Sequence, residues 1–203
     1  MYVKICGLRT PETVAAAVAA GADAVGFVFA PGSPRTITAE HAAELGQAVP
    51  ASVETVGVFR NQPISEVLDI SRRAGVSTVQ LHGSESLEDL ARVHHAGFRS
   101  LRAFSADAYN ALPAAERRVW DAERLLLDAV EPGAGVRFDA AVLINGSPQG
   151  FWLLAGGLNP GNVAQLATTM QASGVDVSSG VESSRGVKDV GLIMEFVRAA
   201  RRQ

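Results

Sequence analysis

The chain has 203 residues, of which 47% are hydrophobic and 19% are charged, and its formal net charge is −3. This composition predicts a single globular domain over residues 1–203 with a substantial core, and it argues against disorder. Basic residues cluster only at Arg198, Arg201 and Arg202, where they suit the end of a helix, so nucleic acid is not an expected partner.

Membrane insertion and secretion are also disfavoured. The chain lacks an apolar run of the roughly 20 residues that a membrane-spanning helix needs, and its start, MYVKICG, lacks the regions of a signal peptide. The single cysteine, Cys6, cannot form a disulfide within the chain, which fits a reducing compartment. We therefore expect a cytoplasmic protein. Its oligomeric state is left open, with a monomer favoured.

Short apolar runs alternate with longer helical segments along the chain. Strands are expected at residues 2–5, 24–29, 53–59, 78–81, 99–104, 124–128, 151–155 and 175–178. Alanine- and leucine-rich segments between them predict helices, most clearly at residues 10–22, 37–49, 63–75, 86–97 and 159–174. Successive strands start about 25 residues apart, which is close to one β-loop-α-loop unit.

This alternation predicts the fold. Apolar strands separated by amphipathic helices are typical of a parallel sheet covered by helices. Eight nearly equal units with no leftover segment favour a closed (β/α)8 TIM barrel with short loops over an open doubly wound sheet. In such a barrel, catalytic groups lie at the carboxyl ends of the strands or in the loops that follow.

Local signals mark where helices begin and end. Thr10 is a candidate cap before Pro11, which suits the first helical position. In the least regular region, residues 105–123, Pro113 should break or start a helix. Four glycines follow helical stretches and are expected to end them in the left-handed conformation: Gly21, Gly75, Gly97 and Gly174.

The first strand combines polar and apolar faces. Tyr2, Lys4 and Cys6 share one face, and we expect it to point into the barrel because the other face is apolar. Asp176 lies on the eighth strand, which closure places beside the first. Since an unpaired buried ammonium is very costly, we predict that Lys4 pairs with Asp176. Lys4 should also help to hold Cys6 as a thiolate, although a cysteine that only packs is the alternative.

Asp128 ends the apolar run Leu125-Leu126-Leu127. Partial desolvation at this position should raise the pKa of its carboxyl group, which suits a general acid. The alternative is a helix N-cap, which is weakened because the following residues have the composition of a loop.

Glycine-containing loops follow the last two predicted strands. Gly156-Gly157 comes after the seventh strand, and Ser178-Ser179-Gly180 comes after the eighth. Loops at these positions of a barrel often bind phosphate through backbone N–H groups. A tight turn is the alternative for each loop considered alone.

Two further side chains follow predicted strands. Arg35, after the second strand, could bind a carboxylate with two donors, and a surface arginine is the alternative. His82, after the fourth strand, could donate to a ligand or stack on it, and a rim residue is the alternative. The single cysteine and the four histidines do not show metal-ligand spacing, so a metal site is not expected.

Several motifs then indicate a family. The chain contains, in this order, KICGLRT, GADAVGFVFAPGSPRTI, VGVF, VQLHG, LLLD, AGGLNPGNV and VDVSSGVESSRGVKD. Together they resemble the phosphoribosylanthranilate isomerases, (β/α)8 barrels of tryptophan biosynthesis. The resemblance implies an Amadori rearrangement of N-(5′-phosphoribosyl)anthranilate to 1-(o-carboxyphenylamino)-1-deoxyribulose 5-phosphate, without a cofactor or metal.

The resemblance also implies roles for individual residues. Cys6, in KICG, matches the general base of the family, and Asp128, in LLLD, matches its general acid. Arg35 matches the arginine that binds the anthranilate carboxylate. The loops at 156–157 and 178–180 match the phosphate cradle. His82 and Asp176 are expected to contact the same phosphorylated sugar substrate.

One segment departs from the family. Family members usually have Gly-Gly-Ser/Thr-Gly-Lys and then Phe-Asp-Trp after the acid, whereas this chain has Glu131 to Arg137 followed by Phe138-Asp139-Ala140. If this segment is a lid over the substrate, affinity or release rate should be altered.

Two other functions are also considered. The first is a related Amadori isomerase of histidine biosynthesis. That family is expected to have an aspartate–aspartate pair at the catalytic positions, and Cys6 at the first position argues against it. A phosphometabolite-binding barrel without catalysis would not need both Cys6 and Asp128, and the altered segment 131–137 gives it slight support.

Overall fold

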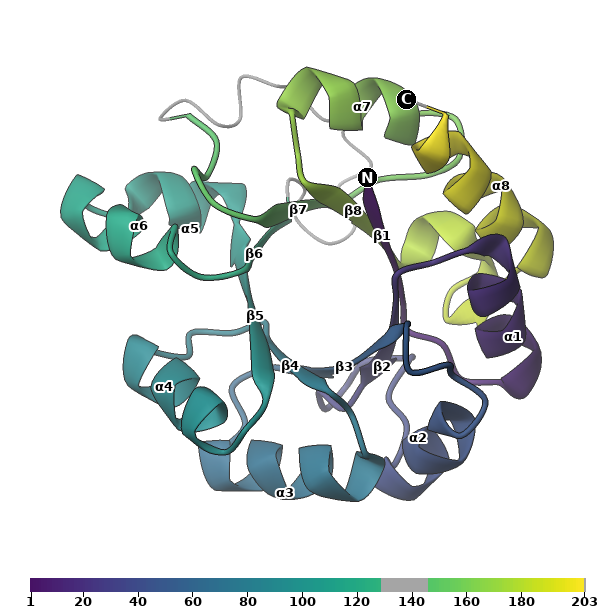
Figure 1. The fold of residues 1–203 in the computed structure, drawn as a ribbon, viewed down its shortest axis with the longest axis horizontal. Helices are drawn as coiled ribbons and strands as arrows, with labels where there is room; N and C mark the ends of the chain where they lie inside the picture. The colour runs from purple at the N-terminus through teal and green to yellow at the C-terminus, as the bar shows by residue number, and fades with distance from the viewer. Residues whose placement is uncertain (129–145, 203) are drawn as a thin grey trace.

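The computed structural model describes residues 1–128 and 146–202, so the altered segment 131–137 lies outside the described residues. Eight parallel strands close into a barrel in chain order, which places the first strand beside the eighth (Figure 1). The fold is therefore the predicted (β/α)8 barrel. The strands are β1 (Tyr2–Cys6), β2 (Ala24–Val28), β3 (Glu54–Phe59), β4 (Thr78–Leu81), β5 (Arg99–Ser105), β6 (Leu125–Asp128), β7 (Trp152–Ala155) and β8 (Gly174–Val177).

Helices surround the barrel (Figure 1). They are α1 (Pro11–Ala20), α2 (Ala39–Gly46), α3 (Ile64–Ala74), α4 (Leu87–His95), α5 (Ala106–Ala111), α6 (Ala114–Trp120), α7 (Val163–Met170) and α8 (Val190–Arg201). After β8, the short 3-10 helix η2 (Ser179–Val181) leads into an antiparallel ribbon of β9 (Glu182–Ser184) and β10 (Val187–Lys188). This ribbon was not anticipated from the sequence.

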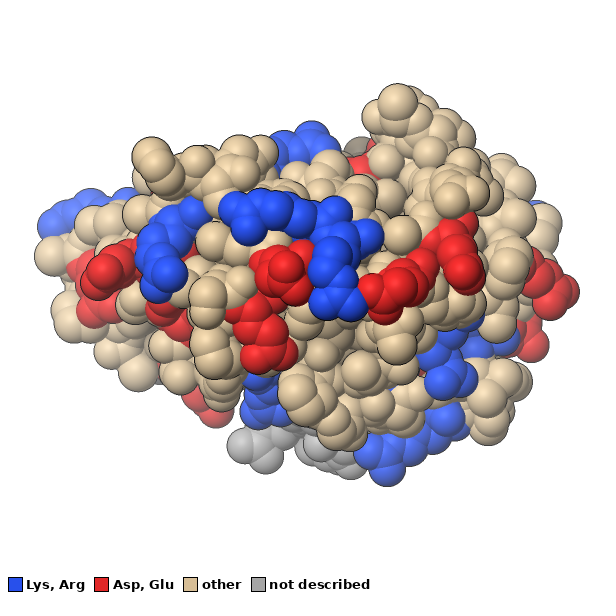
Figure 2. Space-filling model, turned by 90° about the horizontal axis from the view of Figure 1, so that it is seen from below, with Lys and Arg blue, Asp and Glu red and all other residues tan. Residues whose placement is uncertain are grey.

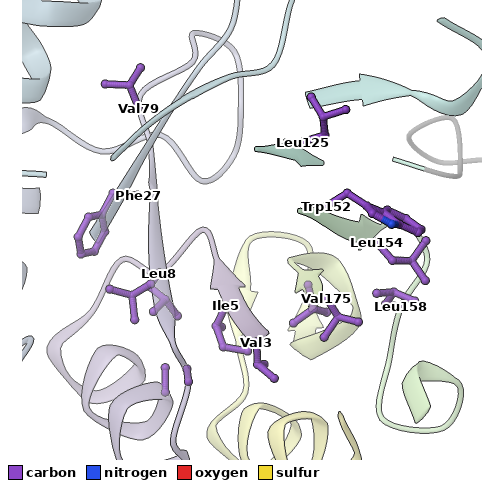
Figure 3. Close-up of a cluster of buried hydrophobic side chains, with 14 of the residues drawn as sticks. Val3, Ile5, Leu8, Phe27, Val79, Leu125, Trp152, Leu154, Leu158 and Val175 are labelled. Atoms are coloured by element: carbon purple, nitrogen blue, oxygen red, sulfur yellow. The ribbon is translucent and has the colours of Figure 1, made fainter. Parts of the chain in front are cut away.

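The main core lies between the strands and the helices. Val3 and Ile5 of β1 belong to this core and are fully buried. Val3 pairs with Val175 across the β1–β8 junction, and Figure 3 shows both among the buried apolar side chains. Because strand residues alternate between faces, Lys4 and Cys6 point to the interior of the barrel, as predicted.

The predicted helix boundaries are largely confirmed. The Thr10 side chain accepts a hydrogen bond from the backbone N–H of Thr13 and caps α1, which begins at Pro11. The left-handed Gly21 and Gly75 end α1 and α3, and α6 begins directly after Pro113. These local signals act through backbone geometry, so they could be identified without knowledge of tertiary contacts.

The expectation for Gly174 is wrong. Helix α7 ends at Met170, and Gln171 takes the left-handed conformation with φ 52°. Gly174 instead begins β8. A Cβ atom there would lie 2.4 Å from the carbonyl oxygen of Tyr2. The glycine is thus explained by the close approach of β1 where the barrel closes.

The surface view shows charges of both signs. Figure 2 shows basic and acidic side chains interspersed on one face of the molecule. The Arg73 side chain, for example, pairs with both Glu40 and Asp69. Within the described ranges, we find no helix that is long and apolar enough to cross a membrane.

Candidate active site

A cavity of about 680 Å³ lies at the carboxyl ends of the barrel strands. Its lining includes every site residue named from the sequence: Cys6, Arg35, His82, Asp128, Gly156, Gly157, Asp176, Ser178, Ser179 and Gly180. The cavity also contains Arg60 and Gln80, which the sequence analysis did not single out. In the described part of the chain, no group of three His, Cys, Asp or Glu residues is arranged to hold a metal ion.

Lys4 and Asp176 form the predicted ion pair. They are register partners across the β1–β8 junction, and Lys4 Nζ lies 2.8 Å from Asp176 Oδ1. Lys4 is fully buried, and Asp176 is 8% exposed and faces the cavity. Since each charge compensates the other, loss of either partner would leave a buried charge that is costly to desolvate.

Cys6 is buried at the end of β1, next to Gly26 of β2. A Cβ atom on Gly26 would lie 3.0 Å from the Cys6 sulfur, so the glycine leaves room for the thiol. Burial and the nearby charge of Asp176 raise the pKa of the Cys6 thiol, and together they outweigh the opposing charges of Lys4 and Lys188. Lys4 therefore favours the thiolate, as expected, but it does not outweigh the effects that favour the neutral thiol.

Asp128, at the end of β6, and His82, directly after β4, approach each other at the mouth of the cavity. His82 Nε2 lies 4.0 Å from Asp128 Oδ2, and the Asp128 side chain is 24% exposed. His82 Nδ1 lies 3.1 Å from the amide nitrogen of Gln80. Burial lowers the pKa of His82 to about 4, so its ring is neutral near pH 7. The expected rise in the pKa of Asp128 stays a prediction.

Arg35 already contacts a carboxylate of its own chain. Its Nε and Nη2 donate to the two oxygens of Glu182, at 2.6 and 2.9 Å. Lys188 Nζ donates to Glu182 Oε1 at 2.7 Å. Although burial opposes the shift, these hydrogen bonds and one from the Gly186 backbone lower the pKa of Glu182 to about 2. Within residues 1–128 and 146–202, Arg35 Nη1 makes no hydrogen bond, so its N–H groups are available to a ligand.

Lys188 and Glu182 were missed as site residues. Both belong to the ribbon that follows β8, and Lys188 also donates to the Ser178 carbonyl oxygen at 2.8 Å. The sequence does contain a signal, because two opposite charges flank the turn-like Ser-Ser-Arg-Gly segment in VESSRGVK. The ribbon thus links Arg35 to the loop after β8.

The two glycine-containing loops contact each other closely. Gly156 and Gly157 have positive φ values, 89° and 65°, which an L-residue rarely adopts. A Cβ atom on Gly180 would lie 1.7 Å from the carbonyl oxygen of Leu158, so only glycine fits there. Backbone groups of both loops therefore line one side of the cavity.

Comparison with known proteins identifies relatives over nearly the whole chain. A family model described as N-(5′-phosphoribosyl)anthranilate (PRA) isomerase matches residues 3–199. The N-(5′-phosphoribosyl)anthranilate isomerase of Deinococcus radiodurans is 42% identical and covers 98% of this chain and 96% of its own. Among solved structures, TrpF from Jonesia denitrificans shares 47% sequence identity with this chain. The two superpose with a TM-score of 0.87, over 99% of this chain and 97% of TrpF.

A further solved structure carries a ligand. It is a phosphoribosylanthranilate isomerase in complex with reduced 1-(o-carboxyphenylamino)-1-deoxyribulose 5-phosphate. It is 32% identical to this chain with a TM-score of 0.84 and covers 100% of both chains.

Proposed function

Because this chain belongs to the N-(5′-phosphoribosyl)anthranilate isomerase family of tryptophan biosynthesis, we propose that Cys6 and Asp128 are the general base and general acid of its reaction. The substrate is N-(5′-phosphoribosyl)anthranilate and the product is 1-(o-carboxyphenylamino)-1-deoxyribulose 5-phosphate. One observation carries the proposal: the thiol, the carboxyl group and the two glycine-containing loops line the same cavity.

The proposed reaction moves protons within one substrate molecule. Asp128 protonates the furanose ring oxygen as the bond from this oxygen to C1′ breaks, and the electrons of the amine nitrogen form a Schiff base. Cys6 then removes the proton from C2′, which gives an enolamine. The enolamine then takes a proton at C1′, which balances the one that Cys6 removed, and loses the hydroxyl proton at C2′, which balances the one that Asp128 gave, so that the ketone forms and both groups are restored. No atom is gained or lost, as an isomerisation requires.

The environment of Cys6 suits the removal of a proton from carbon. The raised pKa means that only a small fraction of Cys6 is thiolate near pH 7, but each thiolate is a strong base. Lys4 and Lys188 counteract part of the burial effect and so increase that fraction. The base is therefore a thiolate formed transiently rather than a resting one.

The remaining site residues fit the two ends of the substrate. The loops at 156–157 and 178–180 offer backbone N–H groups to the phosphate, and Arg35 offers its Nη1 end to the anthranilate carboxylate. Asp176, held by Lys4, accepts from a sugar hydroxyl group. The ligand of the related structure is a reduced deoxyribulose 5-phosphate, which supports a phosphorylated sugar as the ligand of this chain.

A steady-state assay tests the proposed activity. Purified protein should convert N-(5′-phosphoribosyl)anthranilate to the open-chain ketose phosphate without added metal or cofactor. The bulkier substrate of the related isomerase of histidine biosynthesis serves as the comparison. Absence of turnover with phosphoribosylanthranilate, or turnover of the bulkier substrate alone, would overturn the proposal.

Gly180→Ala tests the proposed phosphate cradle. The added methyl group must displace the Leu158 carbonyl oxygen, so the KM for the phosphorylated substrate should rise about 10-fold or more, with a smaller change in kcat. Gly46→Ala, on α2, is the matched control because its added Cβ meets no atom within 4 Å. An unchanged KM in Gly180→Ala would contradict the cradle.

A further inference from the structure

Gln80 is a buried polar residue without an assigned role. It lies on β4 between two residues of the outer core, is 1% exposed and lines the cavity. Its neighbours in sequence, Val79 and Leu81, pack against the helices, so the amide of Gln80 points into the barrel. There its Nε2 lies 3.1 Å from His82 Nδ1.

The neutral His82 ring can exist as either of two tautomers. Because burial disfavours its charged form, the ring carries one proton, on either Nδ1 or Nε2. The two nitrogens have different neighbours: Nδ1 meets the Gln80 amide, and Nε2 meets the Asp128 carboxyl group. The position of this proton therefore decides whether His82 presents a donor or a lone pair beside Asp128.

We propose that Gln80 is a positioning residue that donates to His82 Nδ1 and thereby keeps the His82 proton on Nε2. His82 and Asp128 then bind the same substrate oxygen, the furanose ring oxygen that Asp128 protonates. This inference rests on the proposed function, because it assigns a second partner to the oxygen of the ring-opening step.

The distances suit one shared oxygen. His82 Nε2 and Asp128 Oδ2 are 4.0 Å apart. An oxygen atom placed about 2.8 Å from each would make a hydrogen bond with both. One of its lone pairs receives the Asp128 proton, and the other accepts the N–H of His82. As the bond to C1′ breaks, negative charge develops on this oxygen and the N–H stabilises it.

The opposite tautomer would work against the reaction. A lone pair on Nε2 would face the lone pairs of the substrate oxygen and repel them. It would also require Gln80 to turn its amide so that Oε1 accepts from Nδ1. Within the described residues, Gln80 Oε1 is buried without a hydrogen-bond partner. The orientation of the Gln80 amide is therefore coupled to His82, which Gln80 Nε2 contacts at 3.1 Å, rather than to another side chain of the site.

The tautomer can be measured directly. Protein labelled with ¹⁵N-histidine is examined by NMR without ligand, and His82→Gln assigns the signals of His82 among the four histidines. We expect a protonated Nε2 and an unprotonated Nδ1. A protonated Nδ1 would overturn the inference, and this result does not depend on enzymatic activity.

Gln80→Glu tests the consequence for the reaction. A carboxylate can only accept, so it should draw the proton to Nδ1 and leave a lone pair on Nε2. At about pH 8.5, where the imidazole is neutral, kcat should fall about 100-fold with a smaller change in KM. Gln165→Glu, an exposed position on α7, makes the same chemical change and should leave both constants unaltered.

A double variant separates the tautomer from the new charge. In His82→Gln, the side-chain amide donates without a tautomer to be held. Gln80→Glu should therefore have little further effect on kcat in that background. An equal loss in both backgrounds would show that the charge alone acts, and it would overturn the inference. If the unmodified protein does not turn over phosphoribosylanthranilate, the proposed function fails instead, while the NMR result still stands.

Discussion

Cys6→Ala is expected to lower kcat by about 1,000-fold, because the variant has no group at the end of β1 to remove the C2′ proton. The thiol is small and buried, and the phosphate loops and Arg35 are unchanged, so ligand binding should be kept. Steady-state kinetics give kcat, and calorimetric titration with the reduced ketose phosphate gives the Kd. A kcat within 10-fold of the unmodified protein would mean that another group is the base.

The pH profile gives a second readout of the same residue. Burial raises the pKa of Cys6, and the thiolate fraction increases with pH. The value of kcat/KM does not report this pKa alone, because Asp128 must stay protonated while Cys6 loses its proton. The rate at which iodoacetamide alkylates Cys6, the single cysteine, follows the thiolate and should rise from neutral pH and still be rising near 8.5, the ordinary pKa of a thiol. Cys6→Ala should not react. A plateau already reached at pH 7 would show that Lys4 and Lys188 outweigh burial and the charge of Asp176.

The barrel and its inner ion pair could be predicted because they follow from periodicity. Eight apolar runs at regular spacing predict eight strands, and closure makes β1 and β8 neighbours. Alternation along each strand then places Lys4 and Asp176 on the same inner face, where the structure pairs them. Each step needs only backbone geometry, so a single sequence was sufficient.

The surroundings of the site could not be predicted in the same way. Glu182 and Lys188 reach Arg35 and Ser178 through a ribbon after β8, and short ribbons of this kind show no regular pattern. From the sequence, Gln80 is simply one polar residue in an apolar strand. Its short distance to His82 Nδ1, which suggests a role, is visible only in the structure. The direction of the pKa shift of Cys6 depends on how burial, the carboxylate of Asp176 and two ammonium groups balance, which requires three-dimensional distances.

Several expectations from the sequence stay predictions. The altered segment 131–137 lies outside the described residues, so its effect on substrate binding or release is open to kinetic comparison with relatives. The cytoplasmic location and the monomeric state also stay predictions. By contrast, the family relationship argues against a barrel without catalysis, because relatives that match the chain over nearly its full length are named as isomerases.

Asp128→Asn is expected to lower kcat by about 1,000-fold, because an amide cannot protonate the furanose ring oxygen. Asparagine has nearly the same size and can still donate a hydrogen bond, so KM should change much less than kcat. The reduced ketose phosphate has an open chain and needs no ring opening, and its Kd should stay within a few-fold of the unmodified protein. Asp107→Asn, an exposed position on α5, is the matched control. Equal losses of kcat and of affinity for the open-chain ligand would assign Asp128 to binding, since an acid acts only while the C1′–oxygen bond breaks.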